Sequence, residues 1–163
     1  MIFKKTERLI LRNVAIKDTD IMYDYRNNMI CARYQRGQTK DYKGIVNLIE
    51  MRKNDKISMD RPFLLAIALQ NTNEMIGEIV VMPDADGISL GYTISYKYHR
   101  LGYAFEALSA LINMLHEQFR DCDFIGYTDP KNEPSMELLK KLGFKDRGYD
   151  ADISSQVFRK SFV

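Results

Sequence analysis

The stretch that decides the fold is residues 89–108, SLGYTISYKYHRLGYAFEAL. Its first half alternates Leu90, Tyr92 and Ile94 with small or polar residues, which predicts a β-strand. Its second half predicts a helix, and a basic, glycine-containing turn at residues 99–104 joins the two. A strand that turns into a helix leaves the first N–H groups of the helix unpaired, and the helix dipole adds positive charge there. The turn therefore predicts an anion site suited to phosphate.

Length and composition are those of a globular protein. The 163 residues are 45% hydrophobic and 28% charged, with a net charge of +2. We expect a single domain, residues 1–163, with a substantial core. So small a net charge predicts neither nucleic-acid binding nor binding to a membrane surface. No apolar run has transmembrane length, and the first residues lack the apolar core of a signal peptide, so we expect a cytoplasmic protein.

Cysteine and histidine are scarce in this chain. The two cysteines, Cys31 and Cys122, do not make a disulfide framework. The two histidines, His99 and His116, stand in different settings, and a zinc site needs a cluster of ligands. We therefore expect no metal.

The rest of the chain predicts a mixed sheet with helices. Strands are expected at residues 6–12, 63–69, 75–82 and 124–127, with a last hairpin at 145–150 and 154–162. One helix is expected near Thr19, capped by Asp18, with Ile21, Met22, Tyr25 and Met29 on one face, and a second is expected to be capped by Thr39. A third helix follows the central turn. Because strand–helix–strand units cross over, the strand at 124–127 should run parallel to the central one.

A second informative segment is residues 129–144, DPKNEPSMELLKKLGF. Asn132 is placed to cap a short helix, and Pro134 is tolerated in its first turn. Gly143 can end that helix in the left-handed conformation. An ordinary capped helix accounts for each of these residues.

Taken together, the two segments resemble the cofactor segments of the GCN5-related N-acetyltransferases, the GNAT family. The family's central motif is written Gln/Arg-x-x-Gly-x-Gly/Ala, and here it stands as HRLGYA at 99–104, with His99 in first place and Arg100 next. The second segment matches as Asn-x-x-Ser at 132–135 followed by Leu-Gly-Phe. The opening TERLILR at 6–12 resembles the first strand of the branch that includes the ribosomal-protein N-terminal acetyltransferases. The resemblance extends over essentially the whole chain.

The resemblance implies an α+β fold, a GNAT-type mixed and mostly antiparallel central sheet with helices on both faces. It implies that the central strand and the strand at 124–127 splay apart. The pantetheine arm of acetyl-CoA is then expected along the backbone of Ile94, Ser95 and Tyr96, flanked by Asn132 and Ser135. The pyrophosphate is expected on His99, Arg100, Leu101, Gly102, Tyr103, Ala104 and Phe105. For His99, a surface turn residue is an equally good interpretation.

The implied reaction moves an acetyl group from acetyl-CoA to a primary amine by direct attack in a ternary complex. The amine is a protein N-terminus or a small molecule, and the chemistry needs a base, an oxyanion donor and an acid. Glu78, on the strand beside the central one, is the candidate base, with a solvent-facing strand carboxylate as the alternative. Ser135 and Tyr92 are the candidate acids. Many relatives use a tyrosine shortly after the asparagine, whereas this chain has Met136, Leu138 and Leu139 there.

Some interpretations remain open at this level. A non-catalytic CoA-binding sensor or interaction domain of the same fold is the alternative function. Residues 33–56 carry seven basic and three acidic side chains, which indicates a solvated helix face or a role in substrate selection. A phosphate-binding nucleotide site is disfavoured because no Gly-Lys-Ser/Thr is present. The expected partner is an amine acceptor, and the expected state is a monomer or homodimer.

Overall fold

The structure is a computed structural model that describes residues 1–162. Its strands form one sheet in the order β1-β2-β3-β4-β5-β6-β8-β7. The strands are β1 Ile2–Lys5, β2 Leu9–Asn13, β3 Phe63–Leu69, β4 Met75–Asp84, β5 Gly87–Ile94, β6 Phe124–Thr128, β7 Lys145–Asp150 and β8 Ser155–Lys160. The α-helices are α1 Thr19–Arg26, α2 Met29–Ala32, α3 Tyr42–Arg52, α4 Tyr103–Gln118 and α5 Glu133–Lys141, with 3-10 turns η1 Ile16–Asp18 and η2 Tyr96–Tyr98. Each strand pair is antiparallel except β5 with β6.

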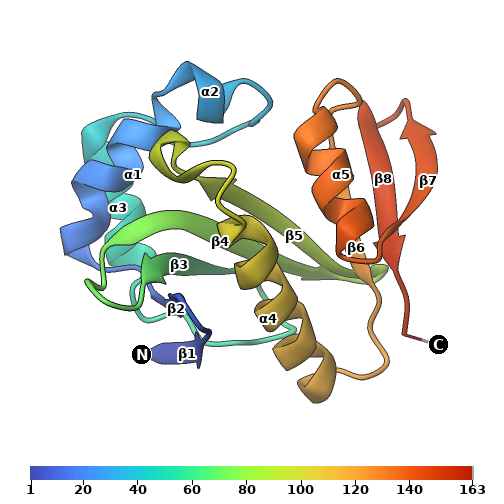
Figure 1. Ribbon diagram of the computed structural model, residues 1–163, viewed down its shortest axis with the longest axis horizontal. Coiled ribbons are helices and arrows are strands. Elements are labelled where there is room, and N and C mark those ends of the chain that lie inside the picture. The colour runs from blue at the N-terminus through green and yellow to red at the C-terminus, as the bar shows by residue number, and fades with distance from the viewer. Residues whose placement is uncertain (163) are drawn as a thin grey trace.

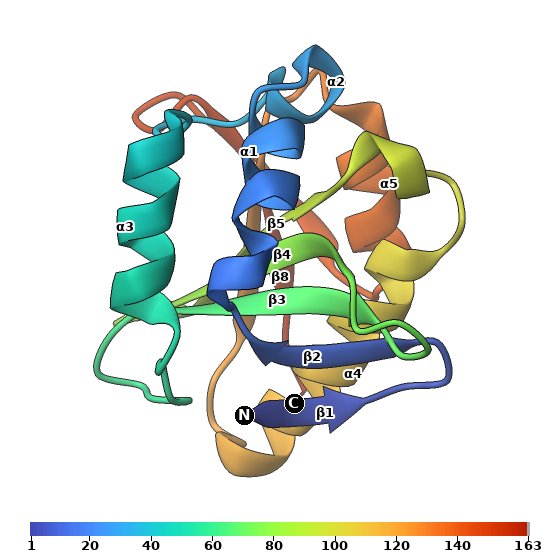
Figure 2. The ribbon, with the colours of Figure 1, turned by 90° about the vertical axis from the view of Figure 1, so that its left-hand side faces the viewer.

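Helices cover both faces of this sheet, as the family resemblance implied (Figures 1 and 2). On one face, Leu108, Leu111 and Leu115 of α4 and Leu139 of α5 join the main core. On the other face, α1 and α3 pack through a second buried cluster that includes Met22, Tyr25, Ile45 and Ile49. The expected α+β architecture is therefore confirmed. No helix within residues 1–162 combines the length and the apolar character needed to cross a membrane.

The central strand β5 has two unequal edges. Toward β4 it is paired along its whole length, from Gly87 opposite Asp84 to Ile94 opposite Gly77. Toward β6 the parallel pairing comprises only Ile88 with Phe124 and Ser89 with Ile125. Beyond that point the two strands separate, and α5 stands beside the far end of β6 (Figure 1). The expected splaying and the parallel direction are both confirmed.

Near the N-terminus the strand expected at residues 6–12 is found at Leu9–Asn13, and the strand β1 before it was not expected. The chain forms two strands, β1 and β2, with a tight turn between them. In that turn the Thr6 N–H donates to the Leu9 carbonyl at 2.9 Å, and the Thr6 hydroxyl accepts from the Leu9 N–H at 3.0 Å. The turn uses the polar groups that an uninterrupted strand would have given to a neighbour.

Both helix caps expected in the first third of the chain are also corrected. Asp18 makes no side-chain cap to α1, because its carboxylate accepts from the Arg12 guanidinium at 2.8 and 2.9 Å and from the Ala15 N–H at 2.8 Å. Asp41, rather than Thr39, caps α3 by accepting from the Gly44 N–H at 3.0 Å. Met29 does not share the buried face of α1, since it starts the separate helix α2 and is 80% exposed.

Candidate active site

The turn before α4 has the conformation of an anion-binding loop. Gly102 is the N-cap of the helix with φ of +81°, in the left-handed region, and no side chain caps the helix there. The first intrahelical hydrogen bond of α4 is the one that the Glu106 N–H donates to the Gly102 carbonyl at 3.1 Å. The preceding N–H groups of the first turn therefore have no partner within the helix. Arg100 is also left-handed, with φ of +62°, and both residues are exposed. The loop has the uncapped helix start and the left-handed backbone that the sequence predicts for an anion site.

His99, at the first motif position, turns away from this loop. Its Nε2 lies 2.7 Å from the Ile94 carbonyl oxygen at the end of β5 and donates to it. The Cys31 thiol contacts the same oxygen at 3.4 Å. Next to it, the Ser95 N–H donates to the Ile76 carbonyl of β4 at 2.7 Å. Two of the backbone groups expected to face pantetheine are thus already engaged within the chain.

The two candidate acids lie in contact with each other. The Tyr92 hydroxyl of β5 and the Ser135 hydroxyl of α5 are 2.8 Å apart, across the space where β5 leaves β6. Burial raises the pKa of Tyr92, and the hydrogen bond to Ser135 offsets part of that rise. Asn132 caps α5 as expected, with its Oδ1 accepting from the Ser135 N–H at 3.3 Å. Residues 43 positions apart in sequence therefore form one pair of hydroxyl groups.

Glu78 is buried rather than solvent-facing, with 2% of its surface exposed. Oε1 accepts from the Tyr25 hydroxyl at 2.7 Å and from Arg26 Nε at 2.8 Å, and Oε2 accepts from Arg26 Nη2 at 2.6 Å. In the sheet register Glu78 stands opposite Thr93 of β5. Burial, followed by the proximity of the Glu78 carboxylate, places the pKa of Tyr25 well above its usual range. Glu78 is therefore held in a fixed, charge-balanced position on the α1–α3 face of the sheet, whereas the Tyr92 side chain packs on the α4–α5 face.

Sequence reasoning missed both partners of Glu78. Tyr25 was assigned to the core, and Arg26 was assigned no role. A signal was available, because Glu78 interrupts an otherwise apolar strand and a buried carboxylate requires a cationic or hydrogen-bonding partner. The identity of that partner depends on how α1 packs on the sheet.

The connection between α2 and α3 reaches across the site. The Gln35 amide donates to the Tyr92 carbonyl at 3.3 Å, and the Tyr34 hydroxyl donates to the Lys131 carbonyl at 3.3 Å. Arg36 donates to the carbonyls of Ile153 and Ser154, in the turn between β7 and β8, at 3.0 and 2.7 Å. This connection therefore contacts β5, the loop just before α5 and the β7–β8 turn.

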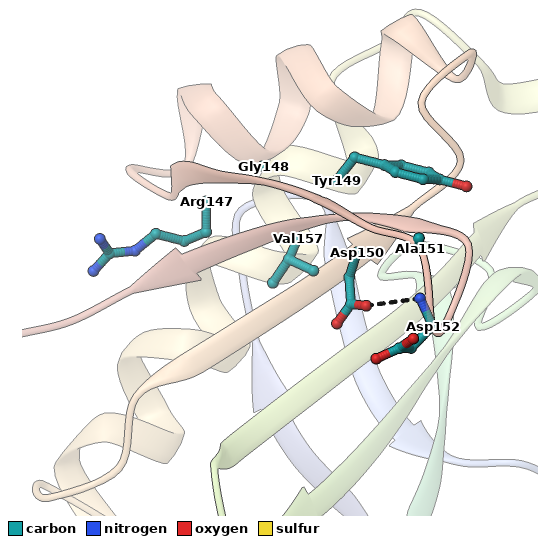
Figure 3. A pocket seen from close by; sticks show the side chains of 7 residues that line it. All are labelled: Arg147, Gly148, Tyr149, Asp150, Ala151, Asp152 and Val157. Carbon is teal, nitrogen blue, oxygen red and sulfur yellow. Dashed lines mark hydrogen bonds between the residues drawn. The ribbon is translucent and has the colours of Figure 1, made fainter.

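A hollow of about 470 Å³ lies elsewhere, along the β7–β8 hairpin (Figure 3). Its lining residues are Arg147, Gly148, Tyr149, Asp150, Ala151, Asp152 and Val157. Within it, Asp150 accepts from the Asp152 N–H at 2.9 Å, which closes the hairpin turn. None of the candidate site residues named from the sequence lines this hollow, and its carboxylates and Tyr149 are exposed on the hairpin. Within residues 1–162, no group of three or more His, Cys, Asp or Glu side chains is placed to hold a metal ion.

Comparison with known proteins identifies the family. The family model described as an acetyltransferase (GNAT) domain matches residues 8–145. The chain belongs to the GNAT acetyltransferase family. The expected family is confirmed, and a ribosomal-protein acetyltransferase is among the proteins that the chain resembles.

Individual relatives agree with this assignment. An uncharacterized N-acetyltransferase, YnaD, from Bacillus subtilis is 26% identical over 149 residues, covering 88% of this chain and 83% of that protein. The ribosomal protein uS5-alanine N-acetyltransferase of Escherichia coli is 36% identical over 63 residues, covering 39% of this chain and 32% of that protein. The crystal structure of a GNAT-family acetyltransferase from Bacillus anthracis has a TM-score of 0.81 at 21% identity, covering 98% of this chain and 96% of that one.

Proposed function

We propose that the protein transfers an acetyl group from acetyl-CoA to a primary amine on a protein N-terminus or a small molecule. The observation that carries this proposal is the uncapped, left-handed turn at Gly102 beside the separation of β5 from β6. In the proposal the pyrophosphate binds the N–H groups of residues 100–105, and pantetheine follows β5 at residues 94–96, with Asn132 and Ser135 opposite. Bound there, acetyl-CoA supplies an acetyl group activated as a thioester.

Glu78 is the proposed base for the amine. Its Oε2 accepts a single hydrogen bond, from Arg26, so this oxygen retains capacity to accept a proton or to order a water. Arg26 and Tyr25 fix the carboxylate, which keeps it in one orientation on β4. A base held in this way is already oriented before the amine binds, which favours proton transfer.

The Tyr92–Ser135 pair is the proposed acid for the leaving thiol. Because burial raises the pKa of Tyr92, its phenol stays protonated at neutral pH and remains a proton donor. The Ser135 hydroxyl, 2.8 Å away, can donate its own proton to the leaving thiolate and take a proton from Tyr92 in return. The pair thus provides the acid although the tyrosine usual in relatives is missing from residues 136–139.

For the acceptor, the most specific support comes from the relatives. One is named for acetylating an alanine of ribosomal protein uS5, which favours a protein N-terminus here. The α2–α3 connection contacts β5 through Gln35 and the β7–β8 turn through Arg36. In the proposal this connection covers the site, and the N-terminus of the acceptor protein binds beneath it. We propose a cytoplasmic location on the same grounds.

A non-catalytic CoA-binding role is the second candidate. The observation that favours it is the engagement of Glu78, which leaves the proposed base only one free acceptor position.

Two measurements separate the candidates. The first is the melting temperature with and without acetyl-CoA, where a hundredfold excess over the dissociation constant should stabilise the protein by about 2.7 kcal/mol. The second is thiol release with a panel of N-terminal peptides and small amines. Binding with turnover supports the transferase, and binding without turnover across the panel supports the second candidate. A melt unchanged by millimolar CoA would overturn both.

A further inference from the structure

We propose that Arg8 is a positioning residue for the Gly102 loop, and that it neutralises Glu106 so that the loop can accept the pyrophosphate of CoA. This inference rests on the proposed function, because it assigns a role toward the same ligand. Arg8 belongs to the turn between β1 and β2, and no motif marks it as part of a cofactor site. Its contacts are made across 98 positions of sequence.

Arg8 is joined to both sides of the loop. Its Nε donates to Glu106 Oε1 at 2.7 Å, and its Nη1 donates to the Leu101 carbonyl at 2.9 Å. Its guanidinium also stacks over the ring of Tyr103, 4.3 Å from the centroid. One side chain therefore contacts the residue before Gly102, the residue after it and the first turn of α4. A planar guanidinium is suited to several fixed contacts of this kind.

Glu106 poses an electrostatic problem that Arg8 solves. A carboxylate in the first turn favours the helix dipole, but it repels an anion bound at the same helix terminus. Burial acts to raise the pKa of Glu106, but hydrogen bonds from Thr6 and Arg8 outweigh it, so the pKa is below the usual range. Glu106 is thus ionised at neutral pH, and its charge must be balanced before a pyrophosphate can approach.

The turn that carries Arg8 is built around this carboxylate. Glu106 Oε2 accepts from the Thr6 hydroxyl at 2.5 Å and from the Arg8 N–H at 2.9 Å. The Arg8 guanidinium also reaches the outer side of the loop, since a Cβ on Gly102 would lie 3.4 Å from Arg8 Nη2. Arg8 therefore sets the net charge of the site as well as the path of its backbone.

The experiment measures CoA affinity by calorimetry for the parent, Arg8→Met, Glu106→Gln and the double variant. Methionine keeps the unbranched stem of arginine without its charge. We expect Arg8→Met to weaken CoA binding about tenfold, since it loses one charge and leaves another uncompensated. Glu106→Gln alone should bind at least as tightly as the parent, and the double variant should regain most of the loss.

Arg159→Met is a matched control, because Arg159 pairs with Asp123 at 2.8 Å and donates to the Asp86 carbonyl at 3.0 Å, away from the loop. It should leave CoA affinity unchanged. If Arg8→Met fails to fold in a melt without ligand, Arg8→Lys replaces it, and should weaken binding less than tenfold while responding to Glu106→Gln in the same direction.

Three results would overturn the inference. The first is an Arg8→Met variant that binds CoA like the parent. The second is a double variant that binds CoA as weakly as Arg8→Met. This result would mean that Arg8 holds the loop in place but does not compensate the charge of Glu106. The third is an equal loss in Arg159→Met. A parent protein that does not bind CoA would instead contradict the proposed function itself.

Discussion

The two edges of β5 differ in what holds them. On the β4 edge, backbone pairing continues from residue 87 to residue 94, and the buried Glu78–Arg26 pair lies on that side. On the β6 edge, backbone pairing stops at Ser89. Farther along, the strand's carbonyls are held by side-chain contacts, from Gln35 to Tyr92 and from His99 and Cys31 to Ile94.

This difference separates the roles of scaffold and site. A continuous ladder with buried side chains opens only at a cost close to global unfolding, whereas isolated side-chain contacts exchange locally. The β4 edge therefore fixes the position of the chemistry, and the β6 edge is the side on which a ligand can replace existing contacts. Substitutions on the two edges should accordingly affect different measurements.

The largest effect is expected at the loop beyond the open edge. Gly102→Glu should abolish CoA binding, because its Cβ would lie 3.4 Å from Arg8 Nη2, where the new carboxylate would compete for the cation that balances Glu106 and add negative charge beside the pyrophosphate. The left-handed φ of +81° adds a strain on the order of 1 kcal/mol. Gly148→Glu is the matched control, since Gly148 has φ of +98° with open space around it. The measurements are the melting temperature without ligand and CoA affinity by calorimetry. A folded Gly102→Glu protein that binds CoA like the parent would show that this turn does not hold the pyrophosphate.

On the closed edge, Glu78→Gln should lower turnover by roughly 10²–10⁴-fold with CoA affinity retained. It should also cost stability, up to about 3–5 kcal/mol, because it removes one partner of a buried ion pair. Asp18→Asn breaks the other buried pair, with Arg12, and is the matched control. It should cost similar stability and leave turnover unchanged when both proteins are assayed well below their melting temperatures. Equal turnover in the two variants would return Glu78 to a purely structural role.

Across the open edge, Tyr92→Phe and Ser135→Ala should each lower turnover by about tenfold. This is less than the roughly 10²–10⁴-fold that is typical of general acid–base catalysis. Because the two hydroxyls form one pair, the double variant should be little worse than the poorer single variant. The raised pKa of Tyr92 also implies that the acid stays protonated beyond the usual tyrosine value of about 10, so activity should not decline on this account below that pH. Strictly multiplicative losses would mean that the hydroxyls act separately.

The smallest effect concerns metal. Turnover should be unchanged by a chelator, because the proposed chemistry uses Glu78, Tyr92 and Ser135 and needs no Lewis acid. The check is thiol release before and after treatment with EDTA. Activity lost to the chelator and restored by zinc would contradict the proposal.

Much of the fold could be predicted because its signals are local. The alternation in residues 89–94, the turn at 99–104 and the apolar spacing of α4 lie within contiguous segments, where backbone periodicity acts directly. The cap at Asn132 and the left-handed Gly143 follow from the same kind of local rule. A local rule failed at Asp18, which was expected to cap a helix and instead pairs with Arg12 of β2, a contact that depends on how the chain turns from the strand into the helix.

The sequence by itself predicted the family, most of the elements and the segments expected to meet CoA, because these depend on residue types at short spacing. Only the tertiary structure decided which side chains act together. Arg26 meets Glu78 across 52 positions, Ser135 meets Tyr92 across 43, and Glu106 meets Arg8 across 98. Such pairs depend on strand order, on the point where β5 leaves β6 and on the face that each helix covers. Propensity and periodicity carry no information about those distances, since they describe neighbours along the chain and not neighbours in space.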